Sequence, residues 1–135
     1  MPVGYPSGMA IRKELTLRLP NSPGALGGVC RLLDAERVNI QAMSLDTSGT
    51  LRMVVDNHVH GAAVLRDRHH QVTERDVVVC TLPNVAGALA GPLRLAADAG
   101  INVEYAYGGS TDTSAMASVV LGVDNVMRAS AATGL

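Results

Sequence analysis

The hydrophobic pattern first becomes regular over residues 14–19, where polar and apolar side chains alternate. This alternation predicts a half-buried strand. Asn21 or Ser22 then suits the N-cap of a helix, with Pro23 in its first turn. Apolar residues at helical spacing extend that predicted helix to about Glu36.

Two further strands are predicted at residues 38–45 and 50–55, joined by a turn in which a glycine supplies the positive φ. Asp56 or Asn57 caps a second predicted helix that runs to about His69, and residues 71–74 read as a fourth strand. Two helices among four strands in the order βαββαβ predict a ferredoxin-like α+β arrangement. We therefore expect antiparallel sheets with their helices on one face.

The second half of the chain repeats the first at an offset of 63 residues, without a gap. The matches are Leu19-Pro20-Asn21 with Leu82-Pro83-Asn84, Gly24-Ala25-Leu26 with Gly87-Ala88-Leu89, and Asn39 with Asn102. The predicted strands of the second repeat are 76–82, 101–107 and 115–123, and its helices are 84–100 and 125–132. Pro92 falls inside the first of these helices, where it predicts a kink because it lacks an N–H.

The repeat predicts two small units, residues 10–74 and residues 75–135, preceded by a flexible N-terminal tail at 1–9. The second unit contains no fourth strand of its own. Residues 8–13 align with residues 71–76 at the same offset. We therefore hypothesise that residues 8–13 supply the fourth strand of the second unit.

Composition restricts the core and the classes of partner. The chain contains no Phe and no Trp, so Val, Leu, Ala, Ile and Met must fill two small cores. Each core is marginal alone, and we expect mutual packing or a homodimer. Cys30 and Cys80 lie in apolar runs and are expected to be reduced and buried. A net charge of −1 gives no electrostatic reason to expect nucleic acid or a membrane surface as partner.

Targeting and catalytic signals are weak. No apolar run approaches the roughly 18 residues of a membrane span, and no signal-peptide pattern opens the chain, so we expect a cytoplasmic protein. No nucleophile–base pair or phosphate loop is recognisable, so we expect neither enzymatic activity nor a cofactor. His58, His60, His69 and His70 lack the usual spacing of zinc ligands.

Each strand–Asn–x–x–Gly–helix junction can bind a negatively charged group. The first peptide N–H groups of a helix have no partner within it, and they lie at the positive end of the helix dipole. Gly24 and Gly87 allow a ligand to approach the backbone closely. The amides of Asn21 and Asn84 can both donate and accept, which suits a zwitterion such as an amino acid.

The residues at 19–26 and 34–40, with their repeats at 84–89 and 100–107, resemble the ACT family, specifically stand-alone tandem ACT proteins. That family carries a polar residue followed by Pro-Gly-x-Leu, then a helix that ends before a Gly-Val/Ile-Asn strand start. Ala86 replaces the motif proline in the second repeat, and Arg37 replaces the motif glycine in the first. The resemblance covers about residues 10–130.

The resemblance implies a module that binds an amino acid and regulates a separate partner, such as an enzyme or a transporter. It also implies that the loop of one domain faces the second-strand start of its neighbour. The expected ligand-binding residues are therefore Asn21, Ser22, Gly24, Ala25, Asn39, Ile40, Asn84, Gly87, Ala88, Asn102 and Val103. In this scheme Asn21 and Gly24 face Asn102 and Val103, and the reciprocal site pairs Asn84 and Gly87 with Asn39 and Ile40.

Other interpretations stay open at this point. Asn21 and Asn84 could serve only as helix caps. The sheets could form an oligomerisation scaffold that binds no metabolite. A dimer could bring the four histidines together as a metal site.

Overall fold

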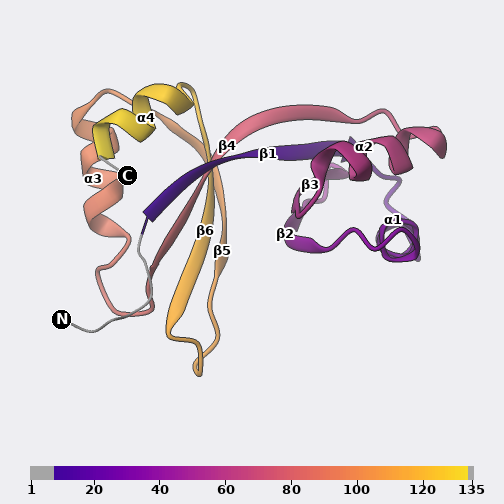
Figure 1. Ribbon diagram of the computed structural model, residues 1–135, viewed down its shortest axis with the longest axis horizontal. Coiled ribbons are helices and arrows are strands. Elements are labelled where there is room, and N and C mark those ends of the chain that lie inside the picture. Colours follow the sequence, from indigo (N-terminus) through magenta and orange to yellow (C-terminus); the bar gives the residue numbers. More distant parts are fainter. Residues whose placement is uncertain (1–7, 134–135) are drawn as a thin grey trace. The chain divides into compact units, whose positions relative to one another are not determined.

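The computed structural model describes residues 8–133, so residues 1–7 of the expected N-terminal tail lie outside the described residues. The elements along the chain are β1 (Gly8–Arg18), α1 (Ala25–Ala35), β2 (Ile40–Leu45), β3 (Thr50–Val55), α2 (His58–Asp67), β4 (Thr73–Pro83), α3 (Ala90–Asp98), β5 (Val103–Gly109), β6 (Met116–Val123) and α4 (Val126–Thr133). Figure 1 shows these ten elements, and their order follows the predicted succession except that the strands predicted at 71–74 and 76–82 form the single strand β4.

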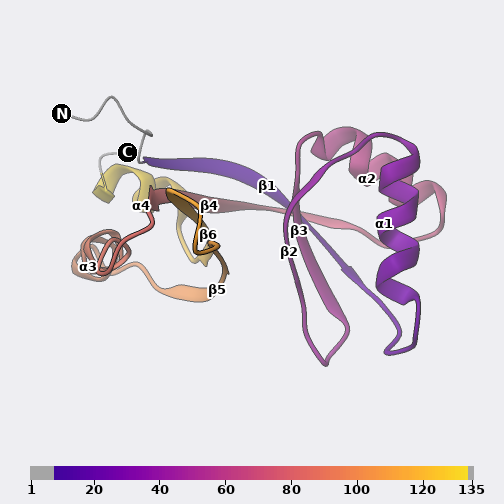
Figure 2. The same ribbon diagram turned by 90° about the horizontal axis from the view of Figure 1, so that it is seen from below.

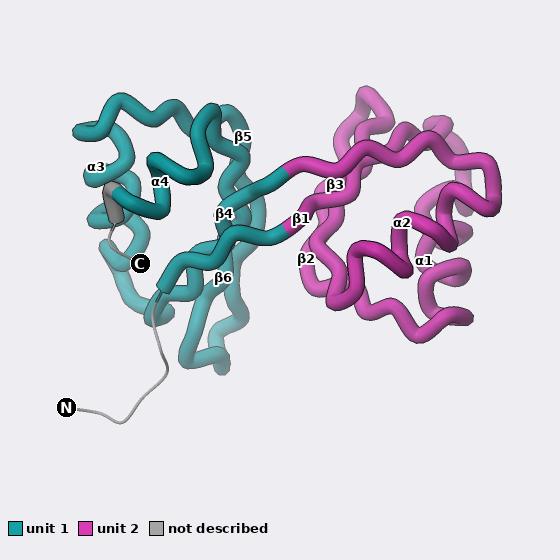
Figure 3. Tube along the Cα trace, turned by 45° about the horizontal axis from the view of Figure 1, so that its top comes forward, with its two compact units in different colours: residues 1–12, 76–135 teal, residues 13–75 magenta. Residues whose placement is uncertain are grey.

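The strand order is β2-β3-β1-β4-β6-β5. Two compact units divide the chain, as Figure 3 shows: unit 2 comprises residues 13–75, and unit 1 comprises the described part of residues 1–12 and 76–135. The long strands β1 and β4 contribute residues to both units. β1 begins at Gly8, so the first residues of this strand belong to unit 1.

In unit 2, β3 pairs antiparallel with both β1 and β2. The predicted alternation along β1 is present, because Leu15, Leu17 and Leu19 are all buried in one core. That core also contains Val29 and Leu33 of α1 and further side chains of α2 and β3. Figure 2 shows both helices on the same side of the unit 2 strands. Thr16 and Arg18, which alternate with the leucines, therefore lie on the opposite face of the sheet.

Unit 1 repeats this arrangement with β6 paired antiparallel to both β4 and β5. Its core gathers Val78, Cys80 and Leu82 of β4 with side chains of the other strands, α3 and α4. The helix predicted to open at Asn84 begins six residues later, at Ala90. Pro92 is consequently the third residue of α3 and lies in its first turn, where a helix needs no N–H donor. Pro92 therefore lies inside the helix as predicted, but at a position that gives no reason for the predicted kink.

The two departures from the repeated motif leave the backbone unchanged. Arg37 adopts a φ of 57° where its repeat counterpart Gly100 adopts 73°, so both residues leave the preceding helix in the left-handed conformation. Ala86 replaces Pro23, yet the glycines that follow, Gly24 and Gly87, have φ values of 84° and 83°. The turn is therefore set by its glycine.

The thiol of Cys80 predicts a dependence of stability on alkaline pH. Cys80 is completely buried, and this burial raises the pKa of its thiol from 9.0 to about 11. The unfolded chain therefore loses this proton at a lower pH than the folded chain, and stability falls as pH rises from about 9 to about 11. The loss from this one group reaches at most about 2–3 kcal/mol.

The measurement is the free energy of unfolding in urea at pH 8 and pH 10.5 for the wild type, Cys80→Ala and Cys30→Ala. We expect the wild type and Cys30→Ala to lose more stability between the two pH values than Cys80→Ala does. Equal losses in all three proteins would show that Cys80 carries no such linkage.

Candidate functional site

The loop between β1 and α1 opens the candidate site in unit 2. The N–H of Leu19 donates to the carbonyl of Gly49 at 2.8 Å, which ties the end of β1 to the β2–β3 turn. Gly24 is the N-cap of α1, and no side chain caps the helix. The prediction that Asn21 or Ser22 is the N-cap is therefore wrong, because the left-handed Gly24 delays the helix to Ala25.

Several peptide N–H groups in this loop have no hydrogen-bond partner. Ser22 donates to the carbonyl of Pro20 at 2.9 Å. Within residues 20–27, by contrast, the N–H groups of Asn21, Gly24, Leu26 and Gly27 have no acceptor among the described residues. These groups lie at or beside the positive end of the α1 dipole. The side chain of Asn21 is exposed and, within residues 8–133, makes no hydrogen bond either.

A cavity of about 140 Å³ lies between this loop and the β2–β3 turn. It is lined by Pro20, Asn21, Ser22, Gly24, Ala25, Leu26, Gly27, Leu45, Asp46 and Gly49. All four unpaired N–H groups therefore belong to residues that line one cavity, together with the Asn21 side-chain amide and the Asp46 carboxylate. The arrangement offers donors for an anionic group and an acceptor for a cationic one.

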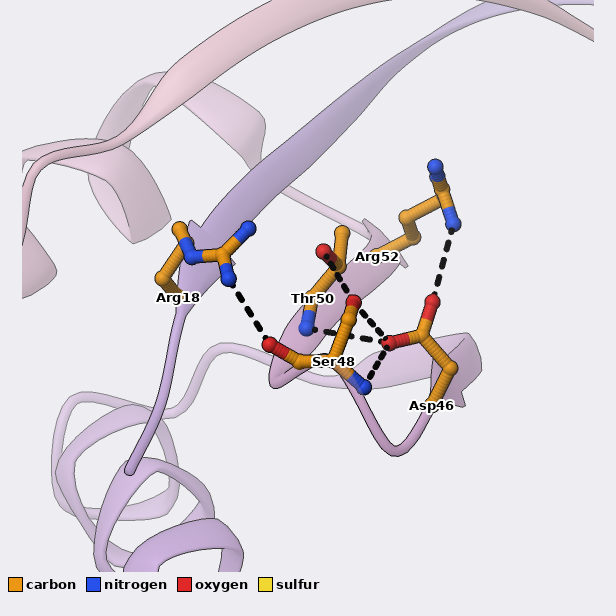
Figure 4. A network of polar contacts seen from close by, with 5 residues as sticks. All are labelled: Arg18, Asp46, Ser48, Thr50 and Arg52. Carbon is orange, nitrogen blue, oxygen red and sulfur yellow. Dashed lines mark hydrogen bonds and ion pairs between the residues drawn. The ribbon is translucent and has the colours of Figure 1, made fainter. Parts of the chain in front are cut away.

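Figure 4 shows how the β2–β3 turn holds Asp46. One carboxylate oxygen, Oδ1, accepts from the N–H of Ser48 at 2.9 Å, from its hydroxyl, and from the N–H of Thr50 at 3.3 Å. The other oxygen, Oδ2, lies 3.8 Å from Nη1 of Arg52. The Ser48 hydroxyl bond, followed by the backbone bonds and the Arg52 charge, holds the pKa of Asp46 below its usual value of 3.8. Asp46 is therefore a carboxylate at neutral pH.

Sequence reasoning did not single out Asp46. Its local pattern, Asp-Thr-Ser-Gly, indicates only a hairpin turn. The available signal was topological, since in a βαββαβ unit the first loop and the β2–β3 hairpin lie at the same end of the sheet.

The equivalent loop of unit 1 differs sharply, because the side chain of Asn84 is fully used. Its Nδ2 donates to the carbonyls of Thr111 at 3.1 Å and Ser114 at 3.0 Å, and its Oδ1 accepts from the hydroxyl of Ser110 at 2.8 Å. Asn84 does not cap a helix, contrary to the prediction. Asn84 follows directly after β4, as Asn21 follows β1, and its side chain connects this end of β4 to the β5–β6 turn.

The partners of Asn84 come from a longer hairpin. The repeat offset is 63 residues between Asn39 and Asn102 but 68 residues between Asp56 and Asp124, so the β5–β6 turn contains five extra residues. Around Asn84, Gly87 keeps its left-handed backbone and Ala88 donates to the carbonyl of Val85 at 3.3 Å. The loop geometry is thus duplicated, whereas its polar side chain is free only in unit 2.

The predicted strand-start residues lie at the far end of each unit's hairpin. The N–H of Asn39 donates to Asp56 Oδ1 at 2.9 Å, and Asn102 donates to Asp124 Oδ1 at 3.1 Å. Ile40 begins β2 and Asn39 directly precedes it, whereas Leu45 at the other end of the strand lines the cavity. Asn102 and Val103 occupy the same place at the start of β5. Within one unit, the loop residues and the strand-start residues are therefore not brought together.

The structure also bears on two other classes of function, metal binding and membrane insertion. In the part of the chain that the structure covers, no group of three His, Cys, Asp or Glu side chains is placed to hold a metal ion. No helix among residues 8–133 is long and apolar enough to cross a membrane.

No family model matches the sequence, and no curated protein matches it. Several solved structures are similar to this chain. A Bacteroides thetaiotaomicron protein, BT0572, is 29% identical with a TM-score of 0.85, over 93% of this chain and 88% of that chain. The ligand-free regulatory subunit of aspartate kinase from Thermus thermophilus is 17% identical with a TM-score of 0.66, over 94% of both chains. Its counterpart from Thermus flavus is 15% identical with a TM-score of 0.65, over 94% and 95%. The chain therefore has the mixed α+β, ACT-like fold of these regulatory subunits.

The contrast between the two loops predicts that replacing the asparagine by alanine lowers the free energy of unfolding more in unit 1 than in unit 2. Asn84→Ala removes three hydrogen bonds that hold the β5–β6 turn, so we expect a loss of about 1–3 kcal/mol in the free energy of unfolding. Asn21→Ala removes no hydrogen bond within residues 8–133 and should change stability by less than about 0.5 kcal/mol. Urea unfolding of both variants checks this, and equal losses would contradict the assignment of Asn84 as the structural residue.

Proposed function

We propose that the chain is a non-catalytic regulatory module, built from tandem ACT-type units, that binds a small amino acid at the β1–α1 loop of unit 2. It has no cofactor and transmits binding to a separate partner protein, such as an enzyme or a transporter. The observation that carries the proposal is the cavity at this loop, where residues with unpaired N–H groups lie together with the Asp46 carboxylate. The fold likeness to regulatory subunits of aspartate kinase supports the regulatory role.

The chemistry of the cavity suits the two charges of an amino acid. The ligand carboxylate accepts from the N–H groups of Gly24, Leu26 and Gly27, where the α1 dipole also favours negative charge. The ligand ammonium donates to Asp46 and to Oδ1 of Asn21. Because Ser22 and Ala25 line the same cavity, their small side chains leave room beside the ligand.

The cavity volume of about 140 Å³ favours a small ligand. No aromatic side chain lines it, so nothing there stacks on a ring.

The strand-start residues Asn39, Ile40, Asn102 and Val103 enter the proposal through a second copy of the chain. In a homodimer, a strand start from one copy closes the open side of the loop in the other copy. In this scheme the unit 1 loop at Asn84, Gly87 and Ala88 is the weaker site, because the Asn84 amide is already satisfied.

The test is calorimetric titration of the purified chain with each of the twenty amino acids, followed by variants against the tightest ligand. Asp46→Asn removes the charge that meets the ammonium, so we expect affinity to fall about tenfold or more. Asn21→Ala should weaken binding by a smaller factor. Asp34→Asn, an exposed change of the same charge on α1, serves as the control and should bind as the wild type does.

Two outcomes would contradict the proposal. If no amino acid binds the wild type, the chain is better explained as an oligomerisation scaffold. If an amino acid binds with equal affinity to the wild type, Asp46→Asn and Asn21→Ala, its site lies elsewhere. The methyl ester of the ligand gives an independent check, because it lacks the carboxylate and should not bind.

A further inference from the structure

Unit 2 contains a second, larger cavity whose polar lining the amino-acid site does not use. Its volume is about 570 Å³, and it is lined by Thr16, Leu17, Arg18, Thr50, His69, His70, Gln71 and Thr73. All of these residues belong to residues 13–75, so the cavity lies within one unit. Only the backbone of the core residue Leu17 is expected to face it, since that side chain is buried with the helices.

The strand register explains why polar groups collect here. Arg18 of β1 lies directly opposite Thr50 of β3. On the other side of β1, the hydroxyl of Thr73 on β4 donates to the carbonyl of Thr16 at 3.4 Å. Because Leu15, Leu17 and Leu19 occupy the helix-covered face, Thr16 and Arg18 lie on the other face.

Three more polar residues come from the connection between α2 and β4. The side chains of His69, His70 and Gln71 make no hydrogen bond within the described chain. His69 adopts a φ of 69°, a left-handed conformation that a histidine takes only at a cost in conformational energy. The turn that places this imidazole beside the cavity would therefore be easier to form with glycine.

The charges around the cavity favour an anion. Arg18 donates one hydrogen bond, from Nη2 to the carbonyl of Ser48 at 2.8 Å, and a guanidinium has five N–H donors in all. No Asp or Glu lines the cavity. Glu74, the acidic residue next to Thr73, does not line the cavity and forms an ion pair with Arg66 at 3.6 Å.

Unit 1 has the same strands as unit 2 but lacks the cationic side chain found at this cavity. At the offset of 63 residues, Thr16 corresponds to Val79 and Arg18 to Thr81. At the hairpin offset of 68 residues, Thr50 corresponds to Ser118. Unit 1 therefore forms the same strands without the cation, so the sheet does not require Arg18 at this position.

We propose that this cavity is a second binding site, specific to unit 2, for a compact oxyanion such as the phosphate group of a phosphorylated metabolite. The Arg18 guanidinium donates to two oxygens at once, and the hydroxyl of Thr16 with the imidazoles of His69 and His70 donates to the others. The Thr50 hydroxyl donates to that of Ser48 at 3.0 Å, because the Ser48 hydroxyl itself donates to Asp46. The two cavities share no lining residue, although Arg18 and Thr50 hydrogen-bond to the β2–β3 turn that holds Asp46.

The test is titration of the ¹⁵N-labelled chain with inorganic phosphate at constant pH and ionic strength, followed by amide NMR. We expect saturable shifts centred on residues 16–18 and 69–73. Sodium acetate and sodium chloride at matched ionic strength should produce none, which separates an oxyanion site of tetrahedral geometry from carboxylate binding or general screening. Non-saturating shifts, or shifts spread evenly over the surface, would overturn the proposal.

Two variants connect the shifts to the site. Arg18→Gln should weaken phosphate binding about tenfold or more, whereas Arg94→Gln, an exposed change of the same charge on α3, should leave it unchanged. His69→Gly removes the imidazole and suits the positive φ, so it should fold at least as stably as the wild type while binding phosphate more weakly. Wild-type affinity in both Arg18→Gln and His69→Gly would show that the cavity is not the site.

Discussion

The structure of the site depends on the left-handed conformation of Gly24. Because this glycine turns the chain from β1 into α1 without a capping side chain, the N–H groups of Leu26 and Gly27 in the first turn of the helix are left without acceptors. A side-chain cap at this point would satisfy one of these donors and reduce the need for a ligand. The same turn brings the loop beside the β2–β3 hairpin, so the donors and the Asp46 carboxylate share one cavity. A zwitterion matches this pairing of opposite charges better than a simple anion does.

The two repeats show how one backbone turn can carry two roles. Gly24 and Gly87 have nearly identical φ values, and the asparagine three residues before each glycine is retained. In unit 1 the longer hairpin supplies Ser110 and two carbonyl groups to Asn84, which becomes a structural residue. In unit 2 the shorter hairpin carries Asp46 instead, and Asn21 stays available. A duplicated chain can in this way keep its fold while one copy retains open polar groups.

The order of elements and most strand positions could be predicted from sequence, because alternation and helical spacing are local consequences of burying one face. The strand predicted at residues 50–55 is observed at those residues. The start of α3 could not be predicted, because Asn84 is a good N-cap by local rules and only the left-handed Gly87 shows that the helix begins later. The different hydrogen bonding of Asn21 and Asn84 could not be predicted from the sequence either. It depends on Ser110, Thr111 and Ser114, which lie about thirty residues away and are brought close only by the fold. The cavity at Arg18 could not be predicted, because its residues come from three separate stretches of the chain, at 16–18, 50 and 69–73.

The most direct test of the account is amide hydrogen exchange read residue by residue, with and without the amino acid that binds. Without ligand, the N–H groups of Gly24, Leu26 and Gly27 should exchange rapidly, while the N–H of Asn84, bonded to the carbonyl of Ala115 at 3.0 Å, should be protected. With saturating amino acid, the three unit 2 amides should become protected. Unchanged rapid exchange at these three amides under saturation would contradict the central claim that they hold the ligand carboxylate.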